Sequence, residues 1–240
     1  RDTLRNAVVP NVLDLPEFQR YCRLFDNAQT AEPAIVIPFR TTVTFGQNFF
    51  GWPLGGGDSS YDSTQFTTKV RSVGVWFSNY NNLGSGMSNT PRVYLIPVGS
   101  DIMRSPTEGN TELRHWRIVD QKLPAPFTLG ATDFLKANYI PQIDSLTDRA
   151  GGINKYSMFR AYHDSGSFDP SQVVTASRLV GRSVANSEWM LIIPAGALAA
   201  DRNEAISRFI DGRLLNNGTR DGNGVSDIKL FFQTYAISGN

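Results

Sequence analysis

The C-terminal end of the chain carries an alternating strand pattern that any fold of this sequence has to accommodate. Residues 224–235 read Gly-Val-Ser-Asp-Ile-Lys-Leu-Phe-Phe-Gln-Thr-Tyr. One face of the predicted strand is apolar and the other polar, with Ile228, Leu230 and Phe232 against Asp227, Lys229 and Gln233. This alternation is typical of a half-buried strand, and each apolar side chain buried there would contribute roughly 1.5–3 kcal/mol. Because an unpaired apolar strand invites aggregation, we expect earlier strands to flank it, so that the C-terminus closes a β-domain.

Strand patterns also recur upstream, with turn-rich segments between them. They lie at residues 34–45, 64–79, 92–98, 115–120, 154–162, 178–184 and 189–193. The Gly/Ser/Asn-rich turn at residues 81–89 predicts that the second and third of these strands form a hairpin. About eight short strands separated by turns are typical of a β-sandwich. We therefore predict an all-β fold in a single domain over residues 1–240, an antiparallel, jelly-roll-like β-sandwich with short helical decorations.

Helix signals are short and few. Asp14 precedes Leu-Pro-Glu, and a proline suits the first turn of a helix. The apolar residues that follow at helical spacing are Phe18, Tyr21, Cys22 and Phe25. A second helix is predicted to begin at Asp201, which forms a capping-box pattern with Glu204, and to end before Gly212. Its expected buried face consists of Ala205, Ile206, Phe209 and Ile210.

The composition is that of a globular chain without a strongly charged partner. Of its 240 residues, 40% are hydrophobic and 19% are charged, which allows a sizeable core and argues against disorder. The 23 basic and 22 acidic residues leave a net charge of +1 without any basic run, so we expect no nucleic-acid partner. No run of about 18 apolar residues occurs, so we expect no membrane-spanning helix and no membrane contact by this segment. Because the chain starts at Arg1, we expect it to be a fragment of a much larger protein.

Side chains that could carry catalysis are sparse. The single cysteine, Cys22, excludes an intrachain disulfide framework and a multi-cysteine zinc site, and we interpret it as a buried free thiol rather than a nucleophile. The two histidines, His115 and His163, lie far apart and do not have zinc-ligand spacing. A triad with Ser165 or Ser167 would lack the Gly-x-Ser-x-Gly nucleophile turn, so we read residues 162–166 as a polar turn.

Two glycine-rich motifs also fail as ligand sites. Residues 221–224 read Asp-Gly-Asn-Gly, but the next residue, Val225, breaks the calcium-loop spacing and favours a tight turn into the last strand. Residues 55–57 are three glycines without the Lys-Ser/Thr of a phosphate loop. No pair of carboxylates is marked as an acid–base couple. We therefore expect no enzymatic activity, no cofactor and no metal site.

The most suggestive binding feature is an aromatic, glycine-rich loop at residues 46–62. It contains Phe49, Phe50, Trp52 and Tyr61, which we take as candidate partner-binding residues. Aromatic side chains on a loop of a β-sandwich can stack on sugars or anchor a protein partner. The alternative is that these rings cap one end of the core.

Three segments of the chain, taken in order, resemble the C-terminal region of Tc toxin A subunits, which docks the B subunit. Residues 69–75, Lys-Val-Arg-Ser-Val-Gly-Val, are similar to the strand that opens that region. Residues 178–181, Arg-Leu-Val-Gly, and 187–194, Ser-Glu-Trp-Met-Leu-Ile-Ile-Pro, resemble the family's glycine turn and the strand after it. Residues 225–230, Val-Ser-Asp-Ile-Lys-Leu, are similar to the family's Ile-Ser-Asp-Val strand near the C-terminus. The segments 99–150 and 195–224 are longer than the family pattern.

The resemblance implies a function for the parent protein and for this segment. The A subunit would be a large homopentamer with a translocation channel, and its C-terminal domains would receive the β-propeller of the B subunit. A toxic enzyme would then pass through the channel. The role implied for this segment is non-catalytic docking by burial of a complementary surface. The implied location is secreted or extracellular, within an insecticidal bacterial toxin complex that acts in virulence.

Two other functions stay open at this point. The aromatic loop also fits a carbohydrate-binding β-sandwich, for which we expect a glycan affinity that depends on Trp52. A hydrolase would need His163 or a pair of carboxylates in one cleft, and no motif in the sequence supports it.

Overall fold

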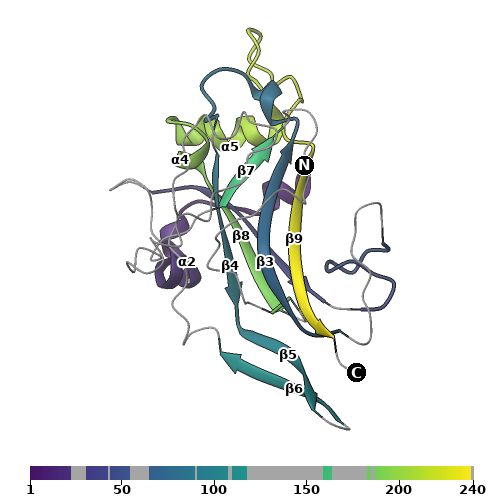
Figure 1. Cartoon of the computed structure of the whole chain (residues 1–240). Helices are drawn as coiled ribbons and strands as arrows, with labels where there is room; N and C mark the ends of the chain where they lie inside the picture. The colour runs from purple at the N-terminus through teal and green to yellow at the C-terminus, as the bar shows by residue number, and fades with distance from the viewer. Residues whose placement is uncertain are drawn as a thin grey trace, which may run out of the picture.

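The fold is mostly β, with few helices (Figure 1). The structure is a computed structural model that describes residues 1–22, 31–42, 44–54, 65–89, 91–107, 110–117, 159–163, 183–184 and 187–238. The helices are α1 (Asp2–Asn6), η1 (Val12–Asp14), α2 (Pro16–Tyr21), η2 (Tyr80–Leu83), α4 (Ala195–Leu198) and α5 (Arg202–Asp211). The strands are β1 (Val8–Val9), β2 (Ala34–Thr41), β3 (Gln65–Ser78), β4 (Arg92–Val98), β5 (Ser100–Thr107), β6 (Asn110–Arg117), β7 (Phe159–His163), β8 (Ser187–Pro194) and β9 (Asp227–Ser238). The prediction of a mostly-β fold with short helices is confirmed.

One sheet organises the described residues. Seven strands follow the order β1-β2-β8-β4-β7-β3-β9, while β5 and β6 pair as a separate hairpin. The N-terminal strand β2 therefore belongs to the same sheet as the C-terminal strand β9. All of these pairs are antiparallel except β3 and β7, where residues 75–77 run parallel to residues 161–163. Parallel neighbours require a long crossover, and the chain passes through β4, β5 and β6 before it returns as β7.

The predicted hairpin of residues 64–79 and 92–98 is wrong. These residues form β3 and β4, but β7 lies between them in the sheet. β7 pairs with β4 at Val93 and Arg92 and with β3 at residues 75–77. The two long strands do run in opposite directions, as a hairpin would. A strand from far along the sequence lies between them in the sheet. Turn signals depend only on neighbouring residues, so they cannot predict such a strand order.

The sheet curls so that its two halves face each other across the core. Trp189 on β8 and Phe232 on β9 have ring centroids 5.3 Å apart, although three strands separate β8 from β9 in the sheet order. Ile35 and Leu191 belong to the same buried cluster as Val75. The pairing between β4 and β7 is short, covering Arg92 and Val93 of β4.

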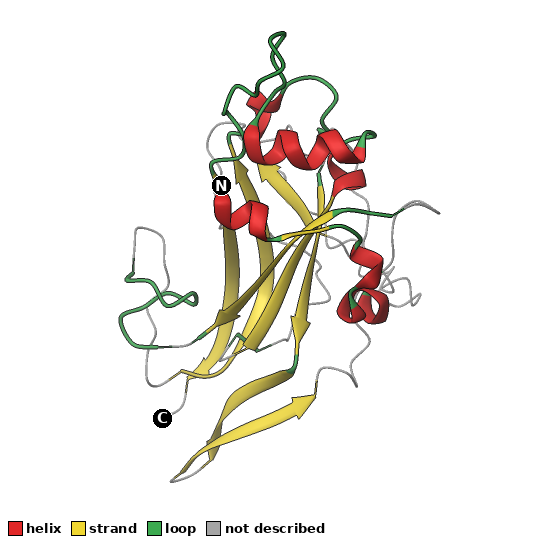
Figure 2. Cartoon of the chain, turned by 180° about the vertical axis from the view of Figure 1, so that it is seen from behind, coloured by secondary structure: helices red, strands yellow, loops and turns green. Residues whose placement is uncertain are grey.

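Helices α4 and α5 lie at one end of the sheet, opposite the end from which the β5–β6 hairpin extends, whereas α2 lies beside the sheet (Figure 2). α5 begins at its predicted cap, where the Asp201 carboxylate accepts hydrogen bonds from the backbone N–H groups of Asn203 and Glu204, both at 3.1 Å. Its predicted buried face is confirmed: Ala205, Ile206, Phe209 and Ile210 are all buried. α2 likewise starts at Pro16. Both helix starts were predicted because the signals lie in adjacent residues. α2 ends at Tyr21, so Cys22 lies just past it, and Phe25 lies outside the described residues.

The last strand differs from its prediction in two ways. It begins at Asp227 rather than Gly224, because the Val225 N–H donates to the Phe209 carbonyl at 2.8 Å and the backbone of Gly224 presses against the end of α5. A side chain at position 224 would collide with the Ile210 carbonyl. The strand is also not flanked on both sides: among the described residues it pairs with β3 alone and forms the edge of the sheet. The predicted alternation holds, since Ile228 is half-buried and Lys229 is exposed.

Candidate functional site

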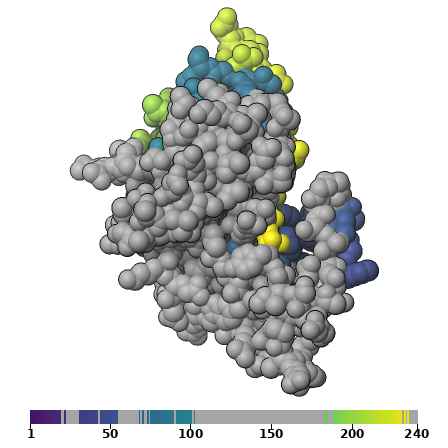
Figure 3. Space-filling model, viewed as in Figure 1, coloured from purple at the N-terminus to yellow at the C-terminus, as the bar shows by residue number. Residues whose placement is uncertain are grey.

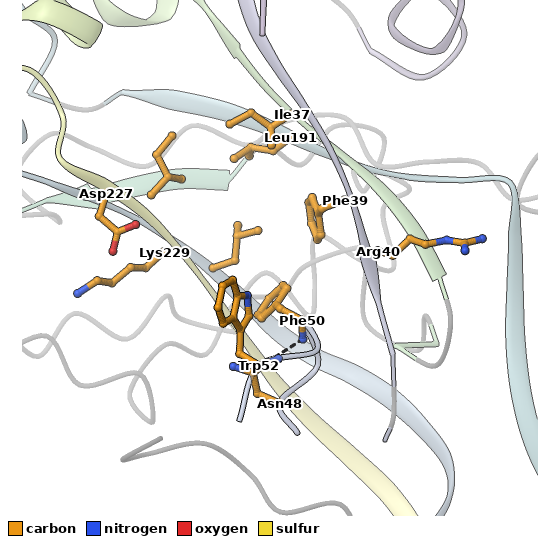
Figure 4. A pocket seen from close by; sticks show the side chains of 11 residues that line it. Ile37, Phe39, Arg40, Asn48, Phe50, Trp52, Leu191, Asp227 and Lys229 are labelled. Atoms are coloured by element: carbon orange, nitrogen blue, oxygen red, sulfur yellow. Dashed lines mark hydrogen bonds between the residues drawn. The ribbon is translucent and has the colours of Figure 1, made fainter. Parts of the chain in front are cut away.

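A pocket of about 770 Å³ lies between β2 and β8 on one side and β9 on the other (Figure 4). The segment of residues 44–54, which follows β2, closes one end of it. Figure 3 shows this segment at the side of the molecule next to β9. The lining residues are Ile37, Phe39, Arg40, Asn48, Phe50, Trp52, Leu191, Asp227, Ile228, Lys229 and Leu230. The floor is apolar, and the charged side chains belong to exposed positions at the rim.

The pocket exists because the curled sheet does not close. β2 and β9 lie at opposite ends of the strand order, yet both contribute to the lining. β1 covers β2 only at Ala34 and Ile35. On β9, the consecutive residues 227–230 all line the pocket. Because successive side chains of a strand point to opposite faces, a pocket that contacts all four runs along the edge of β9.

A short turn presents the aromatic residues to the pocket. The Asn48 side-chain oxygen accepts hydrogen bonds from the backbone N–H groups of Phe50 at 3.0 Å and Trp52 at 3.1 Å. The Asn48 N–H donates to the Trp52 carbonyl at 2.7 Å. Gly51 adopts a φ of 80° between the two aromatics, a conformation that favours glycine. The Thr42 N–H, which donates to the Phe49 carbonyl at 2.8 Å, ties the turn to the end of β2.

The rings behind this turn form one continuous aromatic cluster. Phe50 contacts Phe39 and Phe232, with centroid distances of 6.0 and 5.7 Å. Phe39 stacks on Trp189 at 6.4 Å. Trp189 is buried and its indole N–H donates to the Thr41 hydroxyl at 2.7 Å, which satisfies the indole donor. The cluster therefore fills the sheet interior at this end and leaves the pocket beside it.

The structure separates the four aromatic residues predicted from the sequence. Phe49 packs against the main core and Phe50 lines the pocket from a half-buried position. For these two rings, the alternative of capping the core agrees with the structure. Trp52 is 69% exposed and stands at the pocket rim, as a contact residue should. Tyr61 lies outside the described residues.

Several lining residues were missed from the sequence. Phe39 and Ile37 fall within a predicted strand, and Leu191 falls within another. The strand pattern gives the face of each side chain but not which strands approach each other, so it could not place them at one pocket. The exposed charges Asp227 and Lys229 were predicted to point away from the core, and they do.

The charged side chains at the pocket rim are exposed, and one of them forms an ion pair. Arg40 and Glu188 are cross-strand partners and form an ion pair of 2.6 Å on the surface. Figure 4 shows the Arg40 side chain directed away from the rest of the lining. Because both groups are largely in water, this pair contributes little to stability. The other charged side chains of the lining, Asp227 and Lys229, belong to β9 itself.

Among the described residues that line the pocket there is no histidine or cysteine. His115 lies on β6 and His163 on β7. Cys22 is half-buried and packs against a cluster of buried hydrophobic residues. Burial raises the pKa of its thiol, so the thiol is protonated at neutral pH. Over the described parts of the chain, no cluster of His, Cys, Asp and Glu could hold a metal ion. None of the helices in those parts is long and apolar enough to span a bilayer.

Comparison with protein-family models, with curated proteins and with solved structures finds no match for this chain.

Proposed function

We propose that this chain is a non-catalytic docking module that binds a protein partner at the pocket between β2 and β9. The observation that carries this is the exposure of Trp52, 69% of which is open to solvent at the rim of an apolar pocket. Tryptophan is, with tyrosine and arginine, enriched among the residues that dominate binding energy at protein interfaces. The hydrogen bonds to Asn48 fix the backbone of the turn that carries Trp52 before binding, which lowers the entropic cost of binding.

The proposed partner is the β-propeller of a Tc toxin B subunit. Support comes from the sequence segments that resemble the B-subunit-binding region of Tc toxin A subunits. Residues 69–75 belong to β3, residues 187–194 form β8, and residues 225–230 lead into β9. β8 and β9 both line the pocket, and β3 is the neighbour of β9. These stretches therefore belong to strands around the proposed docking site, while residues 178–181 lie outside the described residues.

This proposal extends to the parent protein. The chain would be the C-terminal part of a secreted toxin A-subunit-like protein that assembles as a homopentamer. Its curled sheet, with side chains of β8 facing side chains of β9, would be a β-sandwich of the docking kind. The domain would contribute no active site, and binding would come from burial of a complementary surface.

Binding of a purified Tc toxin B–C component to this chain tests the proposal. Biolayer interferometry would compare the wild type with Trp52→Ala and with Phe45→Ala. Phe45 is the matched control, since it is 81% exposed in the same segment but does not line the pocket. We expect Trp52→Ala to weaken binding by roughly tenfold or more and Phe45→Ala to leave it unchanged. No binding by the wild type, or equal loss in both variants, would rule out this docking site.

A carbohydrate-binding function is the second candidate. It is favoured by the placement of the exposed Trp52 indole beside polar groups that can bind hydroxyls, namely Asn48, Asp227 and Lys229. A glycan array probed with wild type and Trp52→Ala would identify a sugar ligand by a signal that the variant loses. The absence of any wild-type signal would remove this candidate and leave protein docking.

A further inference from the structure

The strands at the pocket indicate the form in which a partner would bind. This inference rests on the docking function proposed above. β9 is the last strand of the sheet and, in the described residues, pairs with β3 alone. In such an edge strand, alternate N–H and C=O groups point away from the paired neighbour. Since residues 227–230 all line the pocket, backbone hydrogen-bonding groups border it along that stretch.

The opposite wall of the pocket includes residues of β2. β1 covers β2 at Ala34 and Ile35, and the Val36 N–H donates to the Ala7 carbonyl at 2.8 Å. Further along β2, Ile37 and Phe39 line the pocket instead. The chain's own strand β1 therefore pairs with the first residues of β2, and the pocket-lining residues of β2 follow directly after them.

The directions of the strands fix the orientation of such a segment. From β2 to β9 the sheet passes through four antiparallel pairs and one parallel pair. An even number of reversals leaves β2 and β9 running in the same direction. A segment antiparallel to β9 is therefore antiparallel to β2 as well, and this is the relation that β1 already has to β2.

We propose that the pocket receives an extended peptide segment of the protein partner, which adds to the edge of β9 as an antiparallel strand. The charged side chains on the exposed face of β9 determine the charge order that the segment should have. Asp227 and Lys229 are exposed on the same face of β9 and flank the inward-facing Ile228. An antiparallel strand meets Lys229 first and Asp227 last, so the complementary order is acidic, apolar, basic. Opposite charges that face each other across strands attract, and like charges repel.

The walls of the pocket favour a peptide over a second copy of this chain. β9 itself reads Asp-Ile-Lys and has the required charge order. Its edge is bordered, however, by Phe50 and Trp52 of the same chain. Two copies that paired through β9 would each bring this aromatic turn into the other's path. A single extended segment, such as a loop or terminus of the partner, fits beside one β9 without that collision.

Synthetic peptides with defined charge order test this inference on the wild-type chain. Fluorescence polarisation would compare a labelled peptide with a central Glu-Val-Lys against a peptide of the same composition with Lys-Val-Glu. We expect Glu-Val-Lys to bind more tightly by roughly three- to tenfold, since two cross-strand charge pairs change sign between the peptides. Methylation of alternate backbone nitrogens should abolish binding for one alternating set and spare the other.

The double variant Asp227→Lys with Lys229→Asp is the decisive control, because it keeps the net charge and should invert the preference to Lys-Val-Glu. An unchanged preference, no preference, or no sensitivity to N-methylation would overturn strand addition. Light scattering would detect self-association of the chain. If the chain forms a dimer that either single charge variant abolishes, the pocket receives a second copy, and the peptide proposal is overturned. These outcomes are separable from the docking function itself: binding of the B–C component that depends on Trp52 while neither peptide binds would leave docking intact and reject only the added strand.

Discussion

The two ends of this molecule handle their polar and aromatic groups in opposite ways. At the helical end, Phe209 is fully buried and meets Phe77 edge-to-face at a centroid distance of 4.9 Å. At the pocket end, Trp52 is largely exposed and the edge of β9 borders open space. The first arrangement is what a fold needs for stability. The second leaves favourable contacts unmade, which is what a binding surface provides.

Charges follow the same division. The Glu32 side chain is 2% exposed, and it accepts hydrogen bonds from the Gly196 N–H and from Arg202. This links β2 to the start of α4 and α5. At the pocket, by contrast, Asp227 and Lys229 are exposed. A buried charge has to be paired within the chain, whereas an exposed one remains available to a partner.

Truncation of the core at the helical end should have the largest effect on stability. Phe209→Ala removes a buried ring that packs on Phe77 and Tyr80, so we expect a loss of about 3–5 kcal/mol in the free energy of unfolding. Urea denaturation followed by tryptophan fluorescence would measure it. Below the unfolding transition, pocket binding should be unchanged. A loss under 1 kcal/mol would mean that this end is not the stable part of the fold.

The buried carboxylate should come next. Glu32→Ala leaves the Gly196 N–H without its acceptor, and we expect a cost of about 1–3 kcal/mol. Glu32→Gln is the matched control, because the amide keeps an acceptor and should cost less. Chemical denaturation of both variants would give the order, and equal costs would assign the effect to charge rather than to the hydrogen bond.

A change at the aromatic turn should weaken binding more than stability, the opposite of the Phe209 and Glu32 variants. Asn48→Ala removes the acceptor for the Phe50 and Trp52 N–H groups. Because the turn is near the surface, we expect a cost of about 1 kcal/mol or less in stability. Partner binding should weaken more, since Trp52 loses its fixed position. Asn48→Asp retains the acceptor and should retain binding, and a loss of binding in both variants would contradict this explanation.

The smallest effect should be a pH dependence at the helical end. Hydrogen bonds from Arg220, and then Arg208, lower the pKa of Glu204. A carboxylate whose folded pKa lies below its unfolded value stabilises the protein above the unfolded pKa, and this contribution is lost as the pH falls through the folded pKa. The difference in melting temperature between wild type and Glu204→Gln should therefore shrink from pH 7 to about pH 3. A constant difference would mean that Glu204 does not titrate in this range.

Local patterns predicted local features well. The start of α2 at Pro16, the cap of α5 at Asp201, the buried face of α5 and the alternation around Ile228 all appear in the structure. Of the aromatic residues proposed for partner binding, Trp52 is exposed at the pocket rim while Phe49 packs on the core. Exposure of an aromatic residue in a loop depends on what folds over it. The sequence of the loop is the same in either case.

What the sequence by itself determined is the approximate position of β2, β3, β4, β8 and β9 and the alternating faces of β9, because side-chain alternation acts between neighbouring residues. It did not predict β1 or β5, and the predicted strand at residues 178–184 lies mostly outside the described residues. Only the tertiary structure decided that β7 separates β3 from β4 and that β2 meets β9 across a pocket. Those outcomes depend on pairing between residues far apart in the chain, and many pairings bury the same apolar faces. The choice among them is made by packing of the whole core, with Trp189 and Phe232 brought together from strands that the sheet order keeps apart.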